Sequence, residues 1–336
     1  MKKLLLIFSF ASFISFFILK CTSPVKQSRK EAAEIGRYLF FDKRLSYNNT
    51  KSCASCHDPD LAFTDGYHRS VGANGDLHKR NAPTLLNISG SHYFTYADST
   101  IHSIYQQVTI PLFNSQFTEL GAIRNKEAIL ERINNDQVYN KLLQQAAKKK
   151  VNWDDIRLYL EIYCQSLTSY QAKYDKVLKG EAIYTPDEKE GASLFFSNPL
   201  GCSQCHGGIN FNIPTIKSSP YANNGFYEPD SSHVTRKFTT DLGLFECSNN
   251  TSDIGQFKIP SLRNCMLTAP YMHDGRINTM DSVISIYSKG GNKHANKHRL
   301  ITGFPITERE KKQLIQFLQT LTDTAYHKID YFTDPF

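Results

Sequence analysis

The sequence predicts a mainly α-helical protein built from two related helical domains with long irregular loops. A Cys-x-x-Cys-His motif occurs twice, at residues 53–57 and 202–206. Each copy follows a stretch with Gly, Leu, Phe and Phe in the same register, "GRYLFFDKRLS" at residues 36–46 and "GASLFFSNPLG" at residues 191–201. The two halves also end in similar segments of helical pattern, so the chain contains an internal repeat.

The N-terminal segment, residues 1–20, predicts an export signal. Two lysines precede an apolar run at residues 4–19, which is short for a membrane-spanning helix and lies at the very start of the chain. Cys21 follows at once and allows a lipid anchor. The Ile-Leu-Lys before it lacks the small residues that a lipoprotein signal requires, and a retained N-terminal anchor is the alternative. We expect a periplasmic protein, with anchoring as a lipoprotein left open.

Helices are expected around both motifs. The run Thr-Pro-Asp at residues 185–187 is typical of a helix start. Residues 155–170 and 308–323 carry apolar residues on one helical stripe and finish in "QSLT" or "QTLT". We therefore predict a first domain at residues 28–178 and a second at residues 179–328.

Composition and charge indicate the class of protein and which partners to expect. Residues 207–256 are rich in Gly, Asn, Ser and Pro with little periodicity, which predicts a long irregular loop that could wrap a cofactor. Hydrophobic residues make up 40% of the chain and charged residues 21%, as in an ordinary globular protein. Without the three lysines of the N-terminal segment the net charge falls from +7 to +4. This weak, unclustered bias gives no reason to expect nucleic acid as a partner.

Three chemistries use a Cys-x-x-Cys-His motif. A zinc ribbon needs a second cysteine pair roughly 15–20 residues away, and here the second pair lies much farther along the chain. A redox dithiol is expected in βαβ surroundings and does not need the histidine. Haem attachment uses every residue, because each cysteine bonds one vinyl group and the histidine binds the iron. We expect two covalent haem c groups, one on Cys53, Cys56 and His57 and one on Cys202, Cys205 and His206.

Further motifs carry a family resemblance. "SCASCHDPDLAFTDG", "RNAPTLLN", "FKIPSLRN", "LTAPYMHDGR" and "YSKGG" resemble those of the bacterial di-haem cytochrome c peroxidase family, including its MauG-type branch. The resemblance covers about residues 30–325. It implies two cytochrome-c-like helical domains with one haem each. The first haem would react with peroxide, and the second would accept electrons from a donor protein.

The resemblance also implies acid–base groups at the first haem. In "YQQVTIPLFNSQFTELG", Gln107 precedes a proline at the family's spacing, and Glu119 stands in "ELG" where the family has "EMG", after a two-residue insertion. Glu119 would move a proton between the peroxide oxygens, and Gln107 would orient or stabilise the peroxide. In some members a histidine from the loop after "FTDG" caps this haem at rest. Ala73 occupies that position here, so we expect an open site, with His68 and His78 as alternatives.

The second haem needs a sixth ligand, which sets its potential. Counted from His273, the position where peroxidases of the family have methionine is Tyr287, as in the MauG-type branch. Tyr287 is therefore our candidate opposite His206, with Met280 and Met272 as rivals. Between the haems, Tyr96 replaces the family's tryptophan and the neighbouring arginine is gone. Relay of an electron through a tyrosine would be coupled to proton loss.

A calcium ion and the remaining cysteines complete the expected features. The family places calcium between the haems, and the resemblance implies the Asn81 side chain and main-chain oxygens of Thr268 and Pro270 as its protein ligands. Among the cysteines outside the motifs, Cys164 falls on the inward stripe of its helix and is expected to be a buried thiol. The remaining two flank "FKIPSLRN" and either pair or stay free: Cys247 and Cys265.

These features predict a di-haem cytochrome c peroxidase that reduces hydrogen peroxide to water with electrons from a small periplasmic donor, a cytochrome c or a cupredoxin. One alternative is a MauG-type, tyrosine-ligated di-haem oxidase acting on a protein or small organic substrate, which Tyr287 and Tyr96 favour. The other is a non-catalytic di-haem electron carrier. Glu119 and Gln107 argue against a carrier, which has no use for acid–base groups at an open haem. A homodimer is left open.

Overall fold

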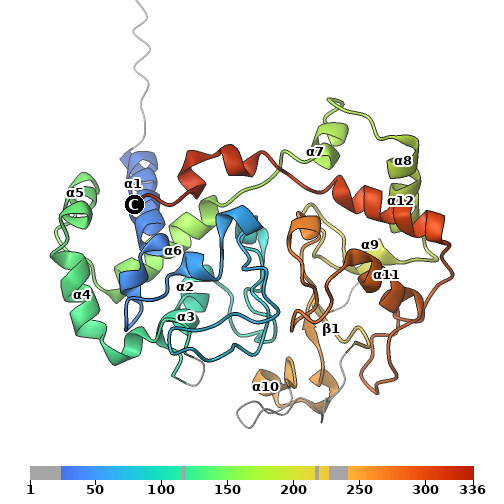
Figure 1. Ribbon diagram of the computed structural model, residues 1–336, viewed down its shortest axis with the longest axis horizontal. Coiled ribbons are helices and arrows are strands. Elements are labelled where there is room, and N and C mark those ends of the chain that lie inside the picture. Colours follow the sequence, from blue (N-terminus) through green and yellow to red (C-terminus); the bar gives the residue numbers. More distant parts are fainter. Residues whose placement is uncertain (1–23, 116–117, 216–218, 227–240) are drawn as a thin grey trace, which may run out of the picture.

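The described chain forms two lobes that lie side by side (Figure 1). The predicted export signal and Cys21 lie outside the described residues. Among the helices that are described, none has the length and apolar character needed to cross a membrane. The computed structural model describes residues 24–115, 118–215, 219–226 and 241–336.

Helices dominate both lobes, which confirms the mainly helical prediction. The first lobe contains α1 (Pro24–Phe41), α2 (Ile104–Gln107), α3 (Thr109–Phe113), α4 (Lys126–Asn134), α5 (Gln137–Gln145) and α6 (Trp153–Ser166). The second contains α7 (Lys173–Leu178), α8 (Pro186–Phe196), α9 (Cys202–Cys205), α10 (Phe245–Ser248), α11 (Met280–Ser288) and α12 (Glu308–Gln319). Strands β1 (Tyr221–Ala222) and β2 (Phe257–Lys258) pair antiparallel, with Tyr221 opposite Lys258.

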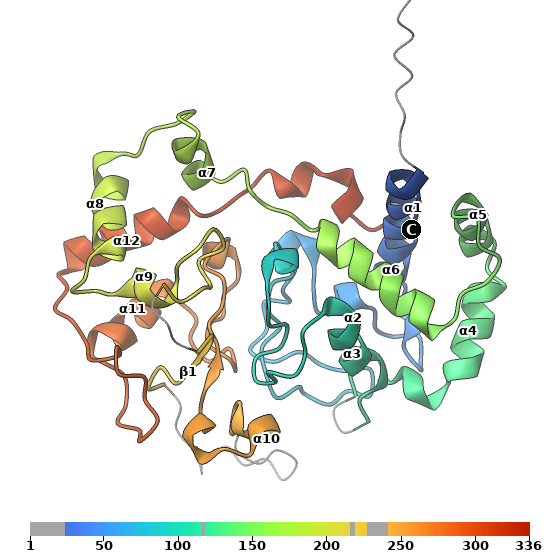
Figure 2. The same cartoon turned by 180° about the vertical axis from the view of Figure 1, so that it is seen from behind.

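The internal repeat has a structural counterpart in one helix pair per lobe. Helix α1 packs on α6, and α8 packs on α12 (Figure 2). A Cβ atom added at Gly36 would lie 2.0 Å from the Tyr159 carbonyl oxygen, and one at Gly191 would lie 1.9 Å from the Gln313 carbonyl oxygen. Each pair therefore crosses so closely that only glycine fits. This explains why both halves carry glycine at the same position before the motif.

The predicted helix start at residues 185–187 is confirmed. The Thr185 hydroxyl accepts a hydrogen bond from the Glu188 backbone N–H at 3.2 Å, and the Glu188 carboxylate accepts one from the Thr185 N–H at 2.7 Å. Thr307 and Glu310 make the same reciprocal pair at the start of α12. Such capping boxes satisfy N–H groups that have no partner inside the helix.

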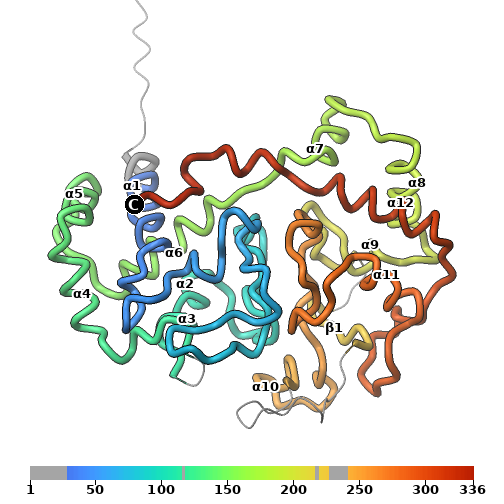
Figure 3. The backbone as a smooth tube through the Cα atoms, viewed as in Figure 1, coloured from blue at the N-terminus to red at the C-terminus, as the bar shows by residue number. Residues whose placement is uncertain are grey.

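Each lobe has its own apolar core, and the chain crosses between them twice. Leu39, Phe40 and Leu160 belong to the first core. After α12 the chain returns to the first lobe, where Tyr326 and Phe332 are buried (Figure 3). Helix α7 falls within the range predicted for the first domain, yet it contacts the second core. The domain ranges stay predictions, and we propose that the second domain begins before α7.

Candidate functional site

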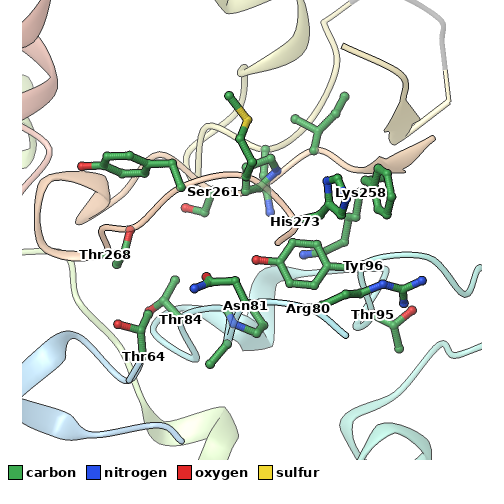
Figure 4. A pocket seen from close by; sticks show the side chains of 18 of the residues that line it. Thr64, Arg80, Asn81, Thr84, Thr95, Tyr96, Lys258, Ser261, Thr268 and His273 are labelled. Carbon is green, nitrogen blue, oxygen red and sulfur yellow. The ribbon is translucent and has the colours of Figure 1, made fainter. Parts of the chain in front are cut away.

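A cavity of about 800 Å³ lies between the lobes and is lined by residues of both. Figure 4 shows the part of it where Arg80 and Asn81 of the first lobe face Lys258 and His273 of the second, with Tyr96 between them. Both Cys-x-x-Cys-His motifs contribute to the same wall, through Cys53, Cys56, His57, Cys202, Cys205 and His206. The two motifs are far apart in the sequence, yet both line this one cavity.

The two motif histidines are held in the same way. Nδ1 of His57 lies 3.0 Å from the Phe63 carbonyl oxygen, and Nδ1 of His206 lies 3.1 Å from that of Phe211. Since a carbonyl can only accept, Nδ1 carries the proton and Nε2 keeps its lone pair for a metal. Burial lowers the pKa of both imidazoles, which keeps them neutral. Both rings thus have the form that an iron ligand requires.

The charge of the cavity wall also fits haem. Burial lowers the pKa of Lys258 to about 8, and none of the described carboxylates forms an ion pair with it. A buried ammonium is stabilised when an anion lies beside it. The propionates of a haem are such anions. Together with the paired cysteines and neutral histidines, this lysine shows that the residues present fit two haem c groups.

Glu119 and Gln107 line the cavity together with the first motif. Burial raises the pKa of the Cys53 and Cys56 thiols, and the nearby Glu119 carboxylate adds to the rise for both. Glu119 therefore lies near both cysteines of this motif. Burial raises the pKa of Glu119 itself to about 7, while 36% of its side chain stays exposed on the cavity wall. A carboxyl group with that pKa can accept and return a proton near neutral pH.

Of the two candidate capping histidines, only His78 borders the cavity. Its Nδ1 lies 3.9 Å from Glu119 Oε1, and its side chain is 13% exposed. His68 is exposed and lies outside the cavity lining. Ala73, at the position expected for a cap, instead donates its backbone N–H to the Glu119 carbonyl oxygen at 2.8 Å. The open first site stays a prediction.

Tyr287 lies near the second motif, in the last turn of α11. Its hydroxyl oxygen accepts a hydrogen bond from Asn224 Nδ2 at 3.2 Å. Burial raises the pKa of Tyr287, the bond from Asn224 lowers it, and the charges of Cys205 and Cys202 raise it further. Tyr287 and both of these cysteines line the same cavity. A donor on the phenol oxygen would favour a phenolate.

The rival methionines also line the cavity. Met280 is 7% exposed and belongs to the second core. The Met272 sulfur lies 3.6 Å from Asn224 Nδ2. Tyr287 as the sixth ligand stays a prediction. Asn224 was not identified from the sequence, because it lies in the irregular loop region, where no periodicity or motif marks it.

Replacement of Tyr287 with phenylalanine is expected to change the optical and EPR spectra of one haem and leave the other unaltered. The reason is that only the phenol oxygen can bind iron, while the ring keeps its packing. Low-temperature EPR of the ferric protein would measure this, with Tyr271→Phe as a matched change of another cavity-lining tyrosine. Identical spectra for Tyr287→Phe and the unaltered protein would rule out ligation.

Tyr96 lies at the interface of the lobes, where its backbone oxygen accepts from the Lys258 N–H at 2.8 Å. Burial raises the pKa of Tyr96, and the positive charge of Arg80 lowers it. Arg80 forms a two-point ion pair with Asp241 of the second lobe, at 2.8 and 2.9 Å. A guanidinium therefore lies near Tyr96 although the family's arginine is missing from its usual place. No motif or spacing marks Arg80 for this role.

The predicted calcium ligands come from both lobes and face the same cavity. Asn81 is buried, and its Nδ2 donates to the Tyr67 carbonyl oxygen at 2.7 Å, which leaves Oδ1 as an acceptor. Thr268 and Pro270 line the cavity on the second-lobe side. No group of three or more His, Cys, Asp or Glu suited to a metal occurs in the part of the chain that is described. A calcium ion here would be coordinated by uncharged amide and main-chain oxygens. The calcium site stays a prediction.

The other cysteines in the described part of the chain are free thiols. Cys164 is buried, as predicted. Cys265 is buried in the second core, whereas the Cys247 sulfur lies 3.9 Å from the Ser99 hydroxyl oxygen. The disulfide alternative for Cys247 and Cys265 is therefore not formed, because each thiol packs in different surroundings.

Comparisons with known proteins give matches that agree with one another. Residues 30–183 match the family described as "Di-haem cytochrome c peroxidase". The chain is 30% identical to cytochrome-c peroxidase IdrP2 of Denitromonas iodatirespirans, over 90% of this chain and 85% of the relative. It is also 30% identical to the methylamine utilization protein MauG of Methylorubrum extorquens, over 87% and 78%. A crystal structure of a MauG-like protein associated with microbial copper homeostasis has 33% identity, a TM-score of 0.85, and coverage of 97% and 99%. The predicted mainly helical, cytochrome-c-like fold is confirmed.

Proposed function

Because the chain belongs to the di-haem cytochrome c peroxidase family, we propose that it is an exported oxidoreductase that reduces hydrogen peroxide to water beside His57. The observation that supports this most directly is Glu119, a carboxyl group whose pKa burial raises to about 7, in the same cavity as the first motif. A haem held by Cys53, Cys56 and His57 supplies the redox chemistry when bound. The chain's own residues supply the proton transfers.

Reduction of one peroxide to two waters consumes two electrons and two protons. The Glu119 carboxylate accepts a proton from one peroxide oxygen and returns it to the other, which then leaves as water. The Gln107 amide donates a hydrogen bond that holds the peroxide in reach of Glu119. The electrons come from a small periplasmic cytochrome c or cupredoxin, enter at the site of His206, and pass the lobe interface near Tyr96.

A second candidate function is MauG-type oxidation of a protein or small organic substrate. The observation that favours it is the Tyr287 hydroxyl, which lies near Cys202 and Cys205 and accepts from Asn224. A tyrosine ligand disfavours the easy reduction that a rapidly turning peroxidase needs. The similarity to MauG and to a MauG-like structure supports this candidate as well. Calcium at Asn81 and export to the periplasm are part of both proposals.

Stopped-flow mixing of the di-haem protein with hydrogen peroxide, then with reduced cytochrome c, tests both functions. Rapid oxidation of cytochrome c over many turnovers supports the peroxidase. A lasting spectral change without oxidation of the donor supports the MauG-type function. If peroxide produces no spectral change at all, both are wrong and an electron carrier is left.

A further inference from the structure

His78 is a partly buried titratable group that the proposed mechanism does not use. It lies on the wall of the cavity beside Glu119, with Nδ1 3.9 Å from Oε1. That separation is within ion-pair distance and longer than a hydrogen bond. The imidazole is the only basic side chain within ion-pair distance of Glu119 among the described residues.

The loop that carries His78 is fixed against the Glu119 segment by backbone contacts. The His78 N–H donates to the Ser70 carbonyl oxygen at 2.8 Å, and Ala73 bonds to the Glu119 backbone. A Cβ atom at Gly72 would lie 1.9 Å from the Thr118 carbonyl oxygen and 3.1 Å from His78 Nε2. Gly72 therefore allows the loop to pack closely against residue 118. The ring of His78 is held between this glycine and Glu119.

Three other charged groups act on the pKa of His78. Burial lowers the pKa of His78, Asp65 and Asp76 raise it, and Lys51 lowers it. The net effect is a lowered pKa, so the neutral imidazole is favoured, and an ionised Glu119 would add to the two carboxylates that favour the imidazolium. The pair can therefore exist in two forms of equal total charge, a carboxylic acid with a neutral imidazole or a carboxylate with an imidazolium.

We propose that His78 is a positioning residue for Glu119, which holds the carboxylate by an ion pair and exchanges one proton with it. In the ionised form the carboxylate is ready to accept a proton from the substrate. The imidazolium then holds a second proton that Glu119 can take up after it has returned the first. No net charge is created in the exchange. This inference rests on the proposed function, because the proposed function is what assigns Glu119 its acid–base role.

The experiment uses the di-haem holoprotein and three variants. His78→Phe keeps an aromatic ring but removes both ring nitrogens. His78→Asn places an amide N–H where Nδ1 was, so it can still donate to Glu119. His68→Phe is the matched control, because His68 is an exposed histidine of the same loop. The readouts are ferric EPR and the rate of cyanide binding from pH 5 to 9, since hydrogen cyanide must lose a proton to bind iron.

His78→Phe is expected to slow cyanide binding about tenfold and to move the acid limb of its pH profile up by roughly one unit, since the carboxylate loses a nearby positive charge. His78→Asn should recover much of the rate, and His68→Phe should match the unaltered protein. Unchanged rate and profile in His78→Phe would overturn the inference. So would a change of spin state in its EPR spectrum, which would make His78 an iron ligand. Failure of the unaltered protein to react with peroxide would instead overturn the proposed function, because cyanide binding needs no peroxide chemistry.

Discussion

Glu119→Gln is expected to slow the reaction with hydrogen peroxide by something on the order of 10²–10⁴-fold. Glutamine has nearly the same shape and can still form hydrogen bonds, but its amide cannot carry a proton between the peroxide oxygens. The pH dependence follows from the pKa of about 7. Since the carboxylate is the base, the rate should rise with pH through 7 and fall about tenfold per unit well below it. Stopped-flow rates from pH 5 to 9 measure both effects.

Glu246→Gln is the matched control for this variant. Glu246 also lines the cavity, but on the second lobe, where it pairs with Lys79 and Arg80. Its replacement should leave both the peroxide rate and its pH profile close to those of the unaltered protein. An unchanged rate in Glu119→Gln with full haem content would remove Glu119 from the mechanism. A flat pH profile in the unaltered protein would remove the carboxylate as the titrating base.

The parts of this fold that could be predicted from the sequence are those that depend on local pattern. Each haem motif is a five-residue unit that contains both attachment cysteines and the iron-binding histidine. The start of α8 follows from Thr185 and Glu188, which are three residues apart and cap the helix reciprocally. The glycine repeated before each motif was visible as a register match, although only the structure shows that Gly191 meets the backbone of α12.

The features that the sequence did not reveal depend on how distant loops meet. Asn224 reaches Tyr287 from the irregular loop region, and Arg80 reaches Asp241 across the lobe interface. The sequence points to His78 only as a candidate iron ligand, because the two-residue insertion before Glu119 hides which residues face each other. Neither hydrophobic periodicity nor turn chemistry encodes such pairings, since they are fixed by tertiary packing.

Arg263 is a further residue whose contacts could not be predicted from the sequence, although it belongs to a recognised motif. It is the arginine of "FKIPSLRN", yet the motif gave it no role. In the structure it is 2% exposed and donates two hydrogen bonds to the Asp175 carboxylate, at 3.0 and 2.8 Å. Its Nε donates to the Ile209 carbonyl oxygen at 2.6 Å, just after the second haem motif. This buried charge pair thus ties α7 to the loop that follows His206.

Asp175→Asn is therefore expected to destabilise the protein by roughly 3–5 kcal/mol, because it leaves the Arg263 guanidinium buried without a counter-charge. Urea unfolding followed by circular dichroism would measure the loss. Asp154→Asn is the control, since Asp154 pairs with Arg157 at the surface with 73% of its side chain exposed. Its replacement should leave the urea midpoint close to that of the unaltered protein. The double variant Asp175→Leu with Arg263→Met removes both charges and should regain most of the stability. If Asp175→Asn unfolds at the same urea concentration as the unaltered protein, the pair does not hold α7 in place.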